Sequence, residues 1–114
     1  MEFQQKQLME EIKAEISYTR DKTGINCLSE NLIRALAQVD RKNFIATKDQ
    51  ARAYENRPLT IGFGQTISQP SIVAIMTELL QLESHYRVLE LGTGSGYQTA
   101  VLAQLVAMVY TVER

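Results

Sequence analysis

Cysteine and histidine are nearly missing from this 114-residue sequence, and each shortage excludes a kind of site. Cys27 is the single cysteine, so the chain cannot form an intramolecular disulfide and fits a reducing compartment. We expect Cys27 to be a small, partly buried thiol rather than a reactive one. His85 is the single histidine and is expected on the surface. Without a second histidine or clustered acids, neither a metal site nor a catalytic triad is predicted.

An excess of charge and long apolar runs are lacking as well. Twelve Lys and Arg residues stand against 13 Asp and Glu residues, a formal net charge of -1, which gives no electrostatic footprint for nucleic acid. No apolar run approaches the length needed to span a membrane, and the polar amino terminus lacks a signal-peptide core. We therefore expect a soluble, cytoplasmic protein that binds neither nucleic acid nor a membrane.

The first third of the chain has the apolar spacing of amphipathic helices. A helix is predicted over residues 2–20, because one face carries apolar side chains at four-residue spacing: Leu8, Ile12 and Ile16. Gly24 is a plausible left-handed terminator after it. A second helix is predicted from Ser29, its amino-cap, to about Asp40. We expect the first helix to serve packing rather than chemistry.

Residues 41–57 are expected to connect this helical part to a loop. Residues 41–45 are predicted to form a solvated turn with an apolar anchor, and an acidic partner for its two bases is the alternative. Residues 48–54 are expected to form a short helical turn. Arg57 precedes Pro58 and is therefore pushed into an extended conformation.

Residues 58–70 read Pro-Leu-Thr-Ile-Gly-Phe-Gly-Gln-Thr-Ile-Ser-Gln-Pro, a polar loop threaded by apolar side chains. Ser68 can cap the helix that follows, and Pro70 lies in its first turn, where a missing amide donor costs little. On the residues alone, capping is the favoured interpretation of Ser68. The helix is expected to end near Leu82 and to present one apolar face, made of Ile72, Ile75, Met76 and Leu79.

Residues 88–97 read Val-Leu-Glu-Leu-Gly-Thr-Gly-Ser-Gly-Tyr, an apolar run that passes into alternating glycines and then into a helix-forming stretch. This order predicts a strand at 87–91, a glycine-rich turn and a helix at 97–106. A second strand at 109–112 ends in Glu113, about twenty residues past the first glycine, where an acid can accept hydrogen bonds from ribose hydroxyls. A nucleoside-containing ligand is therefore favoured, with a purely structural turn as the alternative.

The glycine turn resembles motif I of the adenosylmethionine-dependent methyltransferases, with Glu113 in the position of their ribose-binding acid. Together with Ala-Tyr at 53–54, Pro-Leu at 58–59, the stretch 61–70 and Met-Thr-Glu-Leu-Leu at 76–80, it looks like the protein-L-isoaspartate (D-aspartate) O-methyltransferase family. The Gly-Gln-Thr-Ile-Ser-Gln-Pro segment at 64–70 is far more specific than the glycines. The resemblance covers about residues 30–114.

The resemblance implies an activity, a cofactor and a set of site residues. That family transfers a methyl group from S-adenosylmethionine to the carboxylate of isoaspartyl residues in damaged proteins, which leaves S-adenosylhomocysteine and leads to repair. By resemblance, Ser68 becomes the leading catalytic candidate, with Thr66 beside it. The residues implied in cofactor binding are Glu90, Gly92, Thr93, Gly94, Ser95, Gly96 and Glu113.

The expected fold is α/β, a truncated Rossmann-like methyltransferase fold in a single domain over residues 1–114. Residues 1–82 would form a helical amino-terminal region with the substrate loop 58–70, and residues 87–114 a βαβ start of the cofactor-binding sheet. Family members continue through further strands, so strand 87–91 would keep an open edge, and we expect self-association through it or an exchange of elements between protomers. The alternative function is a truncated, non-catalytic binding or interaction module of the same family.

Overall fold

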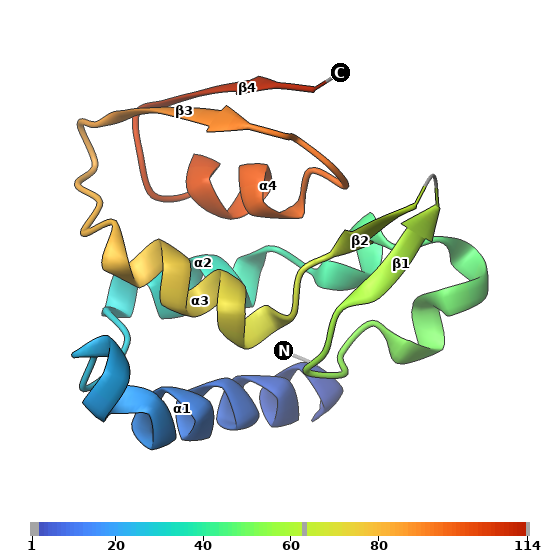
Figure 1. The fold of residues 1–114 in the computed structure, drawn as a ribbon, viewed down its shortest axis with the longest axis horizontal. Helices are drawn as coiled ribbons and strands as arrows, with labels where there is room; N and C mark the ends of the chain where they lie inside the picture. The colour runs from blue at the N-terminus through green and yellow to red at the C-terminus, as the bar shows by residue number, and fades with distance from the viewer. Residues whose placement is uncertain (1–2, 63, 114) are drawn as a thin grey trace.

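Helices make up most of the structure, a computed structural model that describes residues 3–62 and 64–113 (Figure 1). Along the chain the elements are α1 (Phe3–Thr23), α2 (Glu30–Gln38), the short 3₁₀ helices η1 (Arg41–Phe44) and η2 (Thr47–Arg52), β1 (Leu59–Gly62), β2 (Gln65–Ile67), α3 (Pro70–Leu79), β3 (Arg87–Leu91), α4 (Tyr97–Ala103) and β4 (Met108–Val112). The predicted α/β class, helix-rich and followed by a βαβ unit, is confirmed.

The first two helices form where the apolar spacing predicted them. The buried stripe of α1 contains Leu8, Met9, Ile12 and Ile16. Gly24 follows α1 at φ 78° and donates its N–H to the Arg20 carbonyl at 2.8 Å, as expected of a left-handed terminator. The Ser29 hydroxyl caps α2 by accepting from the Leu32 N–H at 3.3 Å. Residue 2, where the first helix was expected to begin, lies outside the described residues.

Cys27 is exposed, so the expectation of a partly buried thiol is wrong. It lies in the short connection between α1 and α2, where the neighbouring apolar residues take the core positions. Ile25 is 7% exposed and Leu28 is 5% exposed. With these two side chains turned inward, the bend at residues 26–27 between them leaves Cys27 on the outside.

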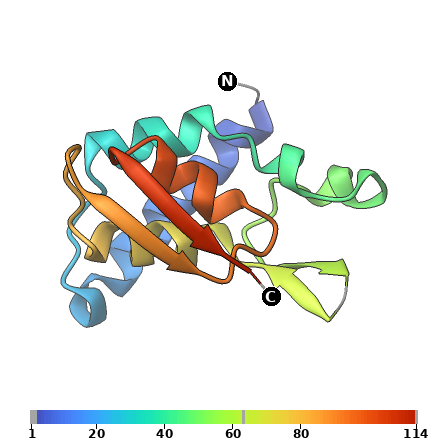
Figure 2. The same ribbon diagram turned by 90° about the horizontal axis from the view of Figure 1, so that it is seen from above.

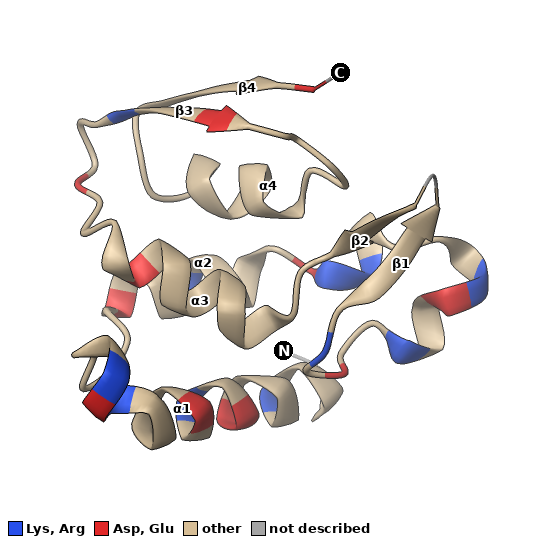
Figure 3. Cartoon of the chain, viewed as in Figure 1, with Lys and Arg blue, Asp and Glu red and all other residues tan. Residues whose placement is uncertain are grey.

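The predicted solvated turn at 41–45 is also wrong, because Arg41 is only 2% exposed. Its guanidinium donates hydrogen bonds to backbone carbonyls of the segment 53–68, which replace the water that burial removes. Burial lowers the pKa of Arg41 from its usual range. Charged side chains otherwise concentrate on α1 and on the η1–η2 region, while α4 carries none (Figure 3). η2 fulfils the expectation of a helical turn at 48–54.

The stretch expected as a loop at 58–70 contains an antiparallel hairpin, β1–β2. Leu59 pairs with Ile67 and Thr60 with Thr66, and the register shifts between Thr60 and Gly62. Leu59 and Ile67 are both buried, so this cross-strand pair ties the hairpin base to the core. Residue 63 lies outside the described residues.

Helix α3 turns a different face to the core from the one predicted. Its buried residues are Pro70, Ser71, Val73, Ala74 and Thr77. Ile72, Met76 and Leu79 are instead 46%, 61% and 51% exposed. The helix is apolar almost all round, so spacing alone could not choose its face. The choice is made by α1 and α2, which pack against the side with the small residues.

The predicted cap of α3 is wrong as well. The amino-cap position is Gln69, without a side-chain capping bond, and the Ser68 hydroxyl does not cap the helix. The Asn56 side-chain carbonyl accepts from the Ser71 N–H at 3.0 Å and satisfies that amide instead. α3 ends at Leu79, before the expected boundary near Leu82.

Strands β3 and β4 pair in parallel, in a continuous register from Arg87 opposite Met108 to Leu91 opposite Val112. Helix α4 makes the crossover between the two strands and covers one face of the pair. Figure 2 shows the strands from their opposite face, with α4 behind them. α4 ends at Ala103, three residues before the predicted boundary at 106. The outward face of the two strands stays uncovered, with Leu89, Leu91, Tyr110 and Val112 all exposed. None of the helices in the described part of the chain is both long and apolar enough to cross a membrane.

Candidate functional site

The glycine turn joins β3 to α4 through backbone conformations that favour glycine. Gly94 has φ 55° and Gly96 has φ 88°, in the left-handed region that other L-residues rarely adopt. The Gly96 N–H donates to the Thr93 carbonyl at 2.9 Å and closes the turn. The Ser95 hydroxyl accepts from the Tyr97 N–H at 3.2 Å, where α4 begins. A Cβ added at Gly94 would meet nothing within 4 Å, so the main chain there is open to a ligand.

The acid before the glycines is held by two threonines. One oxygen of Glu90, Oε1, accepts from the Thr111 hydroxyl at 2.7 Å and also from the Thr99 hydroxyl of α4. The Thr93 and Thr111 hydroxyls form a further hydrogen bond beside it. These contacts fix the orientation of the half-buried Glu90 carboxylate, which lines the cavity described below.

The acid after the second strand, predicted to bind ribose hydroxyls, contacts the glycine turn in the structure. The Gly94 N–H donates to Oε2 of Glu113. The Gly92 N–H continues the ladder with a hydrogen bond to the Val112 carbonyl at 2.8 Å, and the Thr93 N–H reaches the same carbonyl at 3.3 Å. The parallel register therefore delivers Glu113 to the middle of the turn.

A cavity of about 300 Å³ brings the hairpin and the glycine turn together. Thr66, Ile67 and Ser68 lie on its hairpin side, and Glu90, Gly92, Thr93, Gly94 and Ser95 lie on its other side. Its remaining lining comes from α3 and α4: Ile72, Val73, Met76, Tyr97 and Gln98. The two stretches that sequence analysis singled out separately thus share one surface.

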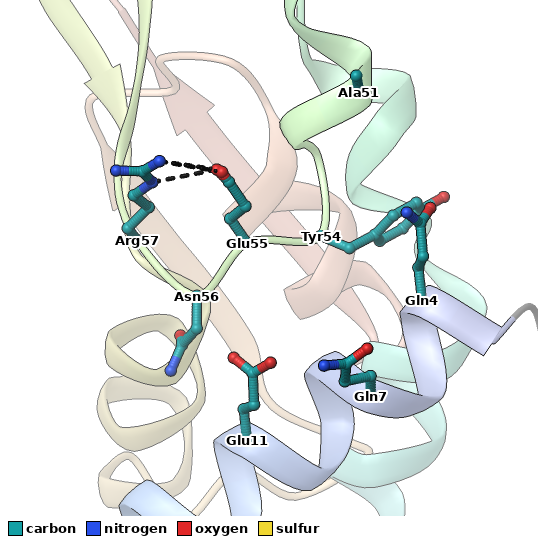
Figure 4. A pocket seen from close by; sticks show the side chains of 8 residues that line it. All are labelled: Gln4, Gln7, Glu11, Ala51, Tyr54, Glu55, Asn56 and Arg57. Carbon is teal, nitrogen blue, oxygen red and sulfur yellow. Dashed lines mark hydrogen bonds and ion pairs between the residues drawn. The ribbon is translucent and has the colours of Figure 1, made fainter.

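A second cavity, of about 340 Å³, is slightly larger but contains none of the predicted site residues. It lies between α1 and the segment that leads into β1, and its lining is Gln4, Gln7, Glu11, Ala51, Tyr54, Glu55, Asn56 and Arg57 (Figure 4). Several of its polar groups are already engaged: Arg57 donates to Glu55 at 2.9 Å, and Tyr54 donates to Asp40 at 2.7 Å. The hydrogen bonds from Arg57 lower the pKa of Glu55. Size alone therefore does not identify the functional cavity.

Tyr97 fixes the end of the glycine turn against the core. Its ring is 4% exposed and packs edge-on against Phe44, with the ring centroids 5.6 Å apart. Burial raises the pKa of Tyr97 to about 12, so the phenol is neutral at physiological pH. In residues 3–62 and 64–113 no group of three or more His, Cys, Asp or Glu side chains is placed to hold a metal ion.

Comparison with protein-family models matches residues 5–114 to the family described as protein-L-isoaspartate(D-aspartate) O-methyltransferase. The chain belongs to this family. Among curated relatives, it is 52% identical over 106 residues to protein-L-isoaspartate O-methyltransferase 2 of a Polaromonas species, covering 93% of this chain and 50% of the relative. It is 60% identical over 86 residues to protein-L-isoaspartate O-methyltransferase of Photobacterium profundum, covering 75% of this chain and 41% of the relative.

Solved structures of isoaspartyl methyltransferases have a similar fold. One superposes with a TM-score of 0.75 at 28% identity and covers 96% of this chain and 33% of its own. Another, a putative protein-L-isoaspartate O-methyltransferase of Plasmodium falciparum in complex with S-adenosyl-L-homocysteine, gives a TM-score of 0.64 at 25% identity, covering 90% of this chain and 48% of its own. The chain spans half or less of the length of the curated relatives it matches. The family itself consists of S-adenosylmethionine-dependent methyltransferases.

Most of the residues predicted from the isoaspartyl methyltransferase resemblance line the glycine-rich cavity, and two lie beside it. Gly96 lies behind the turn, where an added Cβ would come within 3.9 Å of the Phe44 ring. Glu113 contacts the turn through Gly94.

Five lining residues were missed by sequence reasoning: Ile72, Val73, Met76, Tyr97 and Gln98. Ile72 and Met76 were assigned to the core because they are apolar, and only the packing of α3 reveals that they face the cavity. The sequence contained one weak indication of Gln98 as a lining residue, because it is a polar residue at the start of a mostly apolar helix. Its amide donates to the Thr77 hydroxyl at 3.0 Å and links α4 to α3.

Proposed function

We propose that this chain carries the cofactor turn and the substrate hairpin of a protein-L-isoaspartate O-methyltransferase. The reaction would move a methyl group from S-adenosylmethionine to the carboxylate of an isoaspartyl residue in a damaged protein. One observation supports this above the others: the cavity of about 300 Å³ is lined by Thr66 and Ser68 on one side and by the glycine turn on the other. A donor and an acceptor bound on these two sides would meet inside it.

The residues of the cavity fit the cofactor. Gly92 and Gly94 present main chain with nothing within 4 Å of an added Cβ, which lets a ligand lie close to the backbone. Glu90 and Glu113 supply carboxylate oxygens that accept hydrogen bonds from ribose hydroxyls or an ammonium group. Ile72 and Met76 supply apolar surface. The volume lies at the lower end of the roughly 300–1,000 Å³ typical of ligand pockets.

The chemistry asks the protein for position rather than for a base. When bound, the sulfonium supplies an electrophilic methyl carbon, and an isoaspartyl carboxylate is ionised at neutral pH. The protein's tasks are to align the acceptor oxygen with the methyl group and to exclude water. The exposed Ser68 hydroxyl can orient the carboxylate by donating one hydrogen bond to it, with Thr66 beside it.

Two measurements test the proposal in turn. Calorimetric titration with S-adenosylhomocysteine should give stoichiometric heat with the folded chain. Methyl transfer should then occur to an isoaspartyl peptide and not to its aspartyl twin, and Ser68→Ala should lower it about ten-fold, the cost of one hydrogen bond to a charged group. Ser84→Ala removes an exposed hydroxyl that does not line the cavity and is the matched control. A folded chain without heat or transfer would contradict the proposal.

The alternative, a non-catalytic interaction module, is supported by a different feature. The outward face of β3 and β4 exposes Leu89, Leu91, Tyr110 and Val112, and both strands have an unpaired edge among the described residues. Such a surface favours pairing with another chain, so we propose that the chain self-associates there. Gel filtration at micromolar concentration should show a species larger than the monomer, and Leu89→Lys should shift it toward the monomer. A monomeric elution volume for the unsubstituted chain would refute self-association.

The composition of the chain also bears on its cellular location and its partners. The single cysteine supports a reducing, cytoplasmic location. The near-neutral charge gives no electrostatic footprint for nucleic acid, and membership of the family supports isoaspartyl proteins as partners.

A further inference from the structure

Arg41 has the most buried side chain among the charged residues, and the hydrogen bonds of its two terminal nitrogens all go to the backbone. Its Nε finds no hydrogen-bond partner in the described part of the chain. Nη1 donates to the Ala53 and Glu55 carbonyls, both at 3.0 Å. Nη2 donates to the Arg57 carbonyl at 2.8 Å and to the Ser68 carbonyl at 3.2 Å. Each of these bonds is charge-assisted and therefore stronger than a neutral one. Burying a guanidinium is costly, and four carbonyls offset that cost only while their segments stay in place.

The four carbonyls share a location, which is the base of the β1–β2 hairpin. Arg57 precedes β1 and Ser68 follows β2, while Ala53 and Glu55 lie on the approach to the hairpin. The last cross-strand pair at this end is Leu59 with Ile67. Nη2 therefore joins the two strands just beyond the end of their ladder. It also holds the backbone of the residue proposed to orient the acceptor carboxylate.

The side chains of the approach segment make contacts of their own. Figure 4 shows Tyr54, Glu55, Asn56 and Arg57 around the cavity beside α1, with Arg57 bonded to Glu55. Asn56 additionally binds the Ser71 N–H at the start of α3. The segment is thus held by its carbonyls on Arg41 and by Asn56 on α3, which fixes the carbonyls that Arg41 binds.

The other end of η1 contacts the glycine turn. Phe44, three residues after Arg41, packs edge-on against Tyr97, and its ring lies 3.9 Å from the Cβ that Gly96 would carry. Asp40 caps η1 by accepting from the Lys42 N–H at 3.0 Å. A 3₁₀ helix of four residues therefore contacts the substrate hairpin through Arg41 and the cofactor turn through Phe44.

We propose that Arg41 is a positioning residue that sets Ser68 relative to the glycine turn. It acts by cross-linking the hairpin base through backbone carbonyls while its own 3₁₀ helix packs on the first residue of α4. This deepens the proposed function and rests on it for the catalytic consequence. The structural consequence, a hairpin that is held by Arg41, stands independently of any activity.

The test compares Arg41→Lys and Arg41→Met with Lys42→Met in the purified chain. Lys keeps the charge but cannot reproduce a planar fork that reaches several carbonyls, and Met removes all donors. Lys42 is on the same 3₁₀ helix, and its hydrogen bonds use only its backbone. Hydrogen exchange should accelerate about ten-fold or more at residues 59–62 and 65–68 in both Arg41 variants and not in the control, because charged hydrogen bonds are lost.

Two further measurements distinguish a local loosening of the hairpin from a general loss of stability. They are hydrogen exchange in the glycine turn and the affinity for S-adenosylhomocysteine. Exchange at residues 92–96 and the affinity for S-adenosylhomocysteine should stay within about two-fold, because none of the Arg41 hydrogen bonds goes to the glycine turn. In a chain that transfers methyl groups, kcat should fall about ten-fold with KM for S-adenosylmethionine unchanged.

Three results would overturn the assignment. One is unchanged hairpin exchange in a folded Arg41→Met variant, or in Arg41→Lys should the Met variant not fold. Another is exchange that rises equally in α1 and in the glycine turn. A hairpin that loosens while kcat stays constant would overturn the catalytic part. If the unsubstituted chain binds no S-adenosylhomocysteine, the proposed function fails, but the hairpin exchange still decides whether Arg41 holds the hairpin.

Discussion

The helical region, residues 3–79, and the β3–α4–β4 unit, residues 87–112, differ in how they bury apolar side chains. The helical region packs α1, α2, α3 and the hairpin base around a shared core. In the second unit only α4 contributes fully buried residues, namely Tyr97, Val101 and Leu102. No residue of β3 or β4 is buried, and the face away from α4 is open. Stability therefore comes mainly from the first region, and the ligand-facing backbone mainly from the second.

The difference also explains where function is located. The glycine turn can expose its main chain because the helical region holds it from behind, through Phe44 against Tyr97. The hairpin, in turn, is anchored by a buried arginine rather than by a large sheet. The proposed catalytic surface is built from two weakly covered pieces, so it depends on the few contacts that join them.

The largest expected effect is on the free energy of unfolding, when the same Leu→Ala substitution is made in each region. Leu32→Ala removes a side chain that is 2% exposed in the helical core, and we expect a loss of about 2–5 kcal/mol in the free energy of unfolding. Leu89→Ala removes one that is 65% exposed on β3 of the monomer, so at protein concentrations too low for self-association the expected change is within about 0.5 kcal/mol. Urea unfolding followed by circular dichroism measures both. Equal losses would show that the open face of β3 is covered in solution.

The second effect concerns the contact between the regions and appears at alkaline pH. Burial raises the pKa of Tyr97 from 10.0 to about 12, so the folded chain keeps a proton that the unfolded chain loses. The resulting stability is complete below about pH 10 and is lost as the pH rises toward 12, by roughly 2–3 kcal/mol.

Tyr97→Phe should remove this alkaline loss, and urea midpoints at pH 8 and pH 11 measure it. Tyr18, whose ring is 87% exposed, supplies the control, and Tyr18→Phe should parallel the unsubstituted chain. A Tyr97→Phe profile that still falls like the unsubstituted one would mean that the phenol is not buried against Asp40 and Arg41.

The smallest expected effect separates the two regions by function. Gly24 follows α1 at φ 78° and Gly94 lies in the turn at φ 55°, and an added Cβ meets nothing within 4 Å at either position. Alanine should cost a similar amount at both, about 1–2 kcal/mol, because each residue is left-handed. Only Gly94→Ala should weaken S-adenosylhomocysteine binding, by about ten-fold, measured by calorimetry. Equal affinities for the two variants would show that the ligand does not approach Gly94.

The elements that sequence reasoning predicted well are those whose signal is local. In α1 polar residues separate the apolar positions, so the apolar spacing predicts a single buried face. The structure buries that face. The glycine turn carries its own conformational demand in three glycines, and the register of β4 then brings Glu113 to it. Each of these outcomes depends on a few neighbouring residues.

The errors arise where distant packing decides. α3 is apolar on most sides, so the position of α1 and α2, not its own spacing, determines that Ile72 and Met76 stay outside the core. Nothing near Arg41 in the sequence indicates that carbonyls 12 to 27 residues later will surround it. Ser68 matched the pattern of a helix cap, but Asn56 reaches the α3 amide through the tertiary structure.

The parallel pairing of β3 with β4 has a consequence for how the acid and the glycines are matched. Leu91 lies opposite Val112, so the next positions, Gly92 and Glu113, leave the ladder side by side. What holds the acid at the turn is thus strand alignment and not the number of residues in between. An insertion that lengthened α4 by a whole turn would keep Glu113 beside the glycine turn if β4 still paired with β3 in the same register. A slip of one residue in β4 would send the carboxylate to the opposite face of the sheet, with the chain length unchanged.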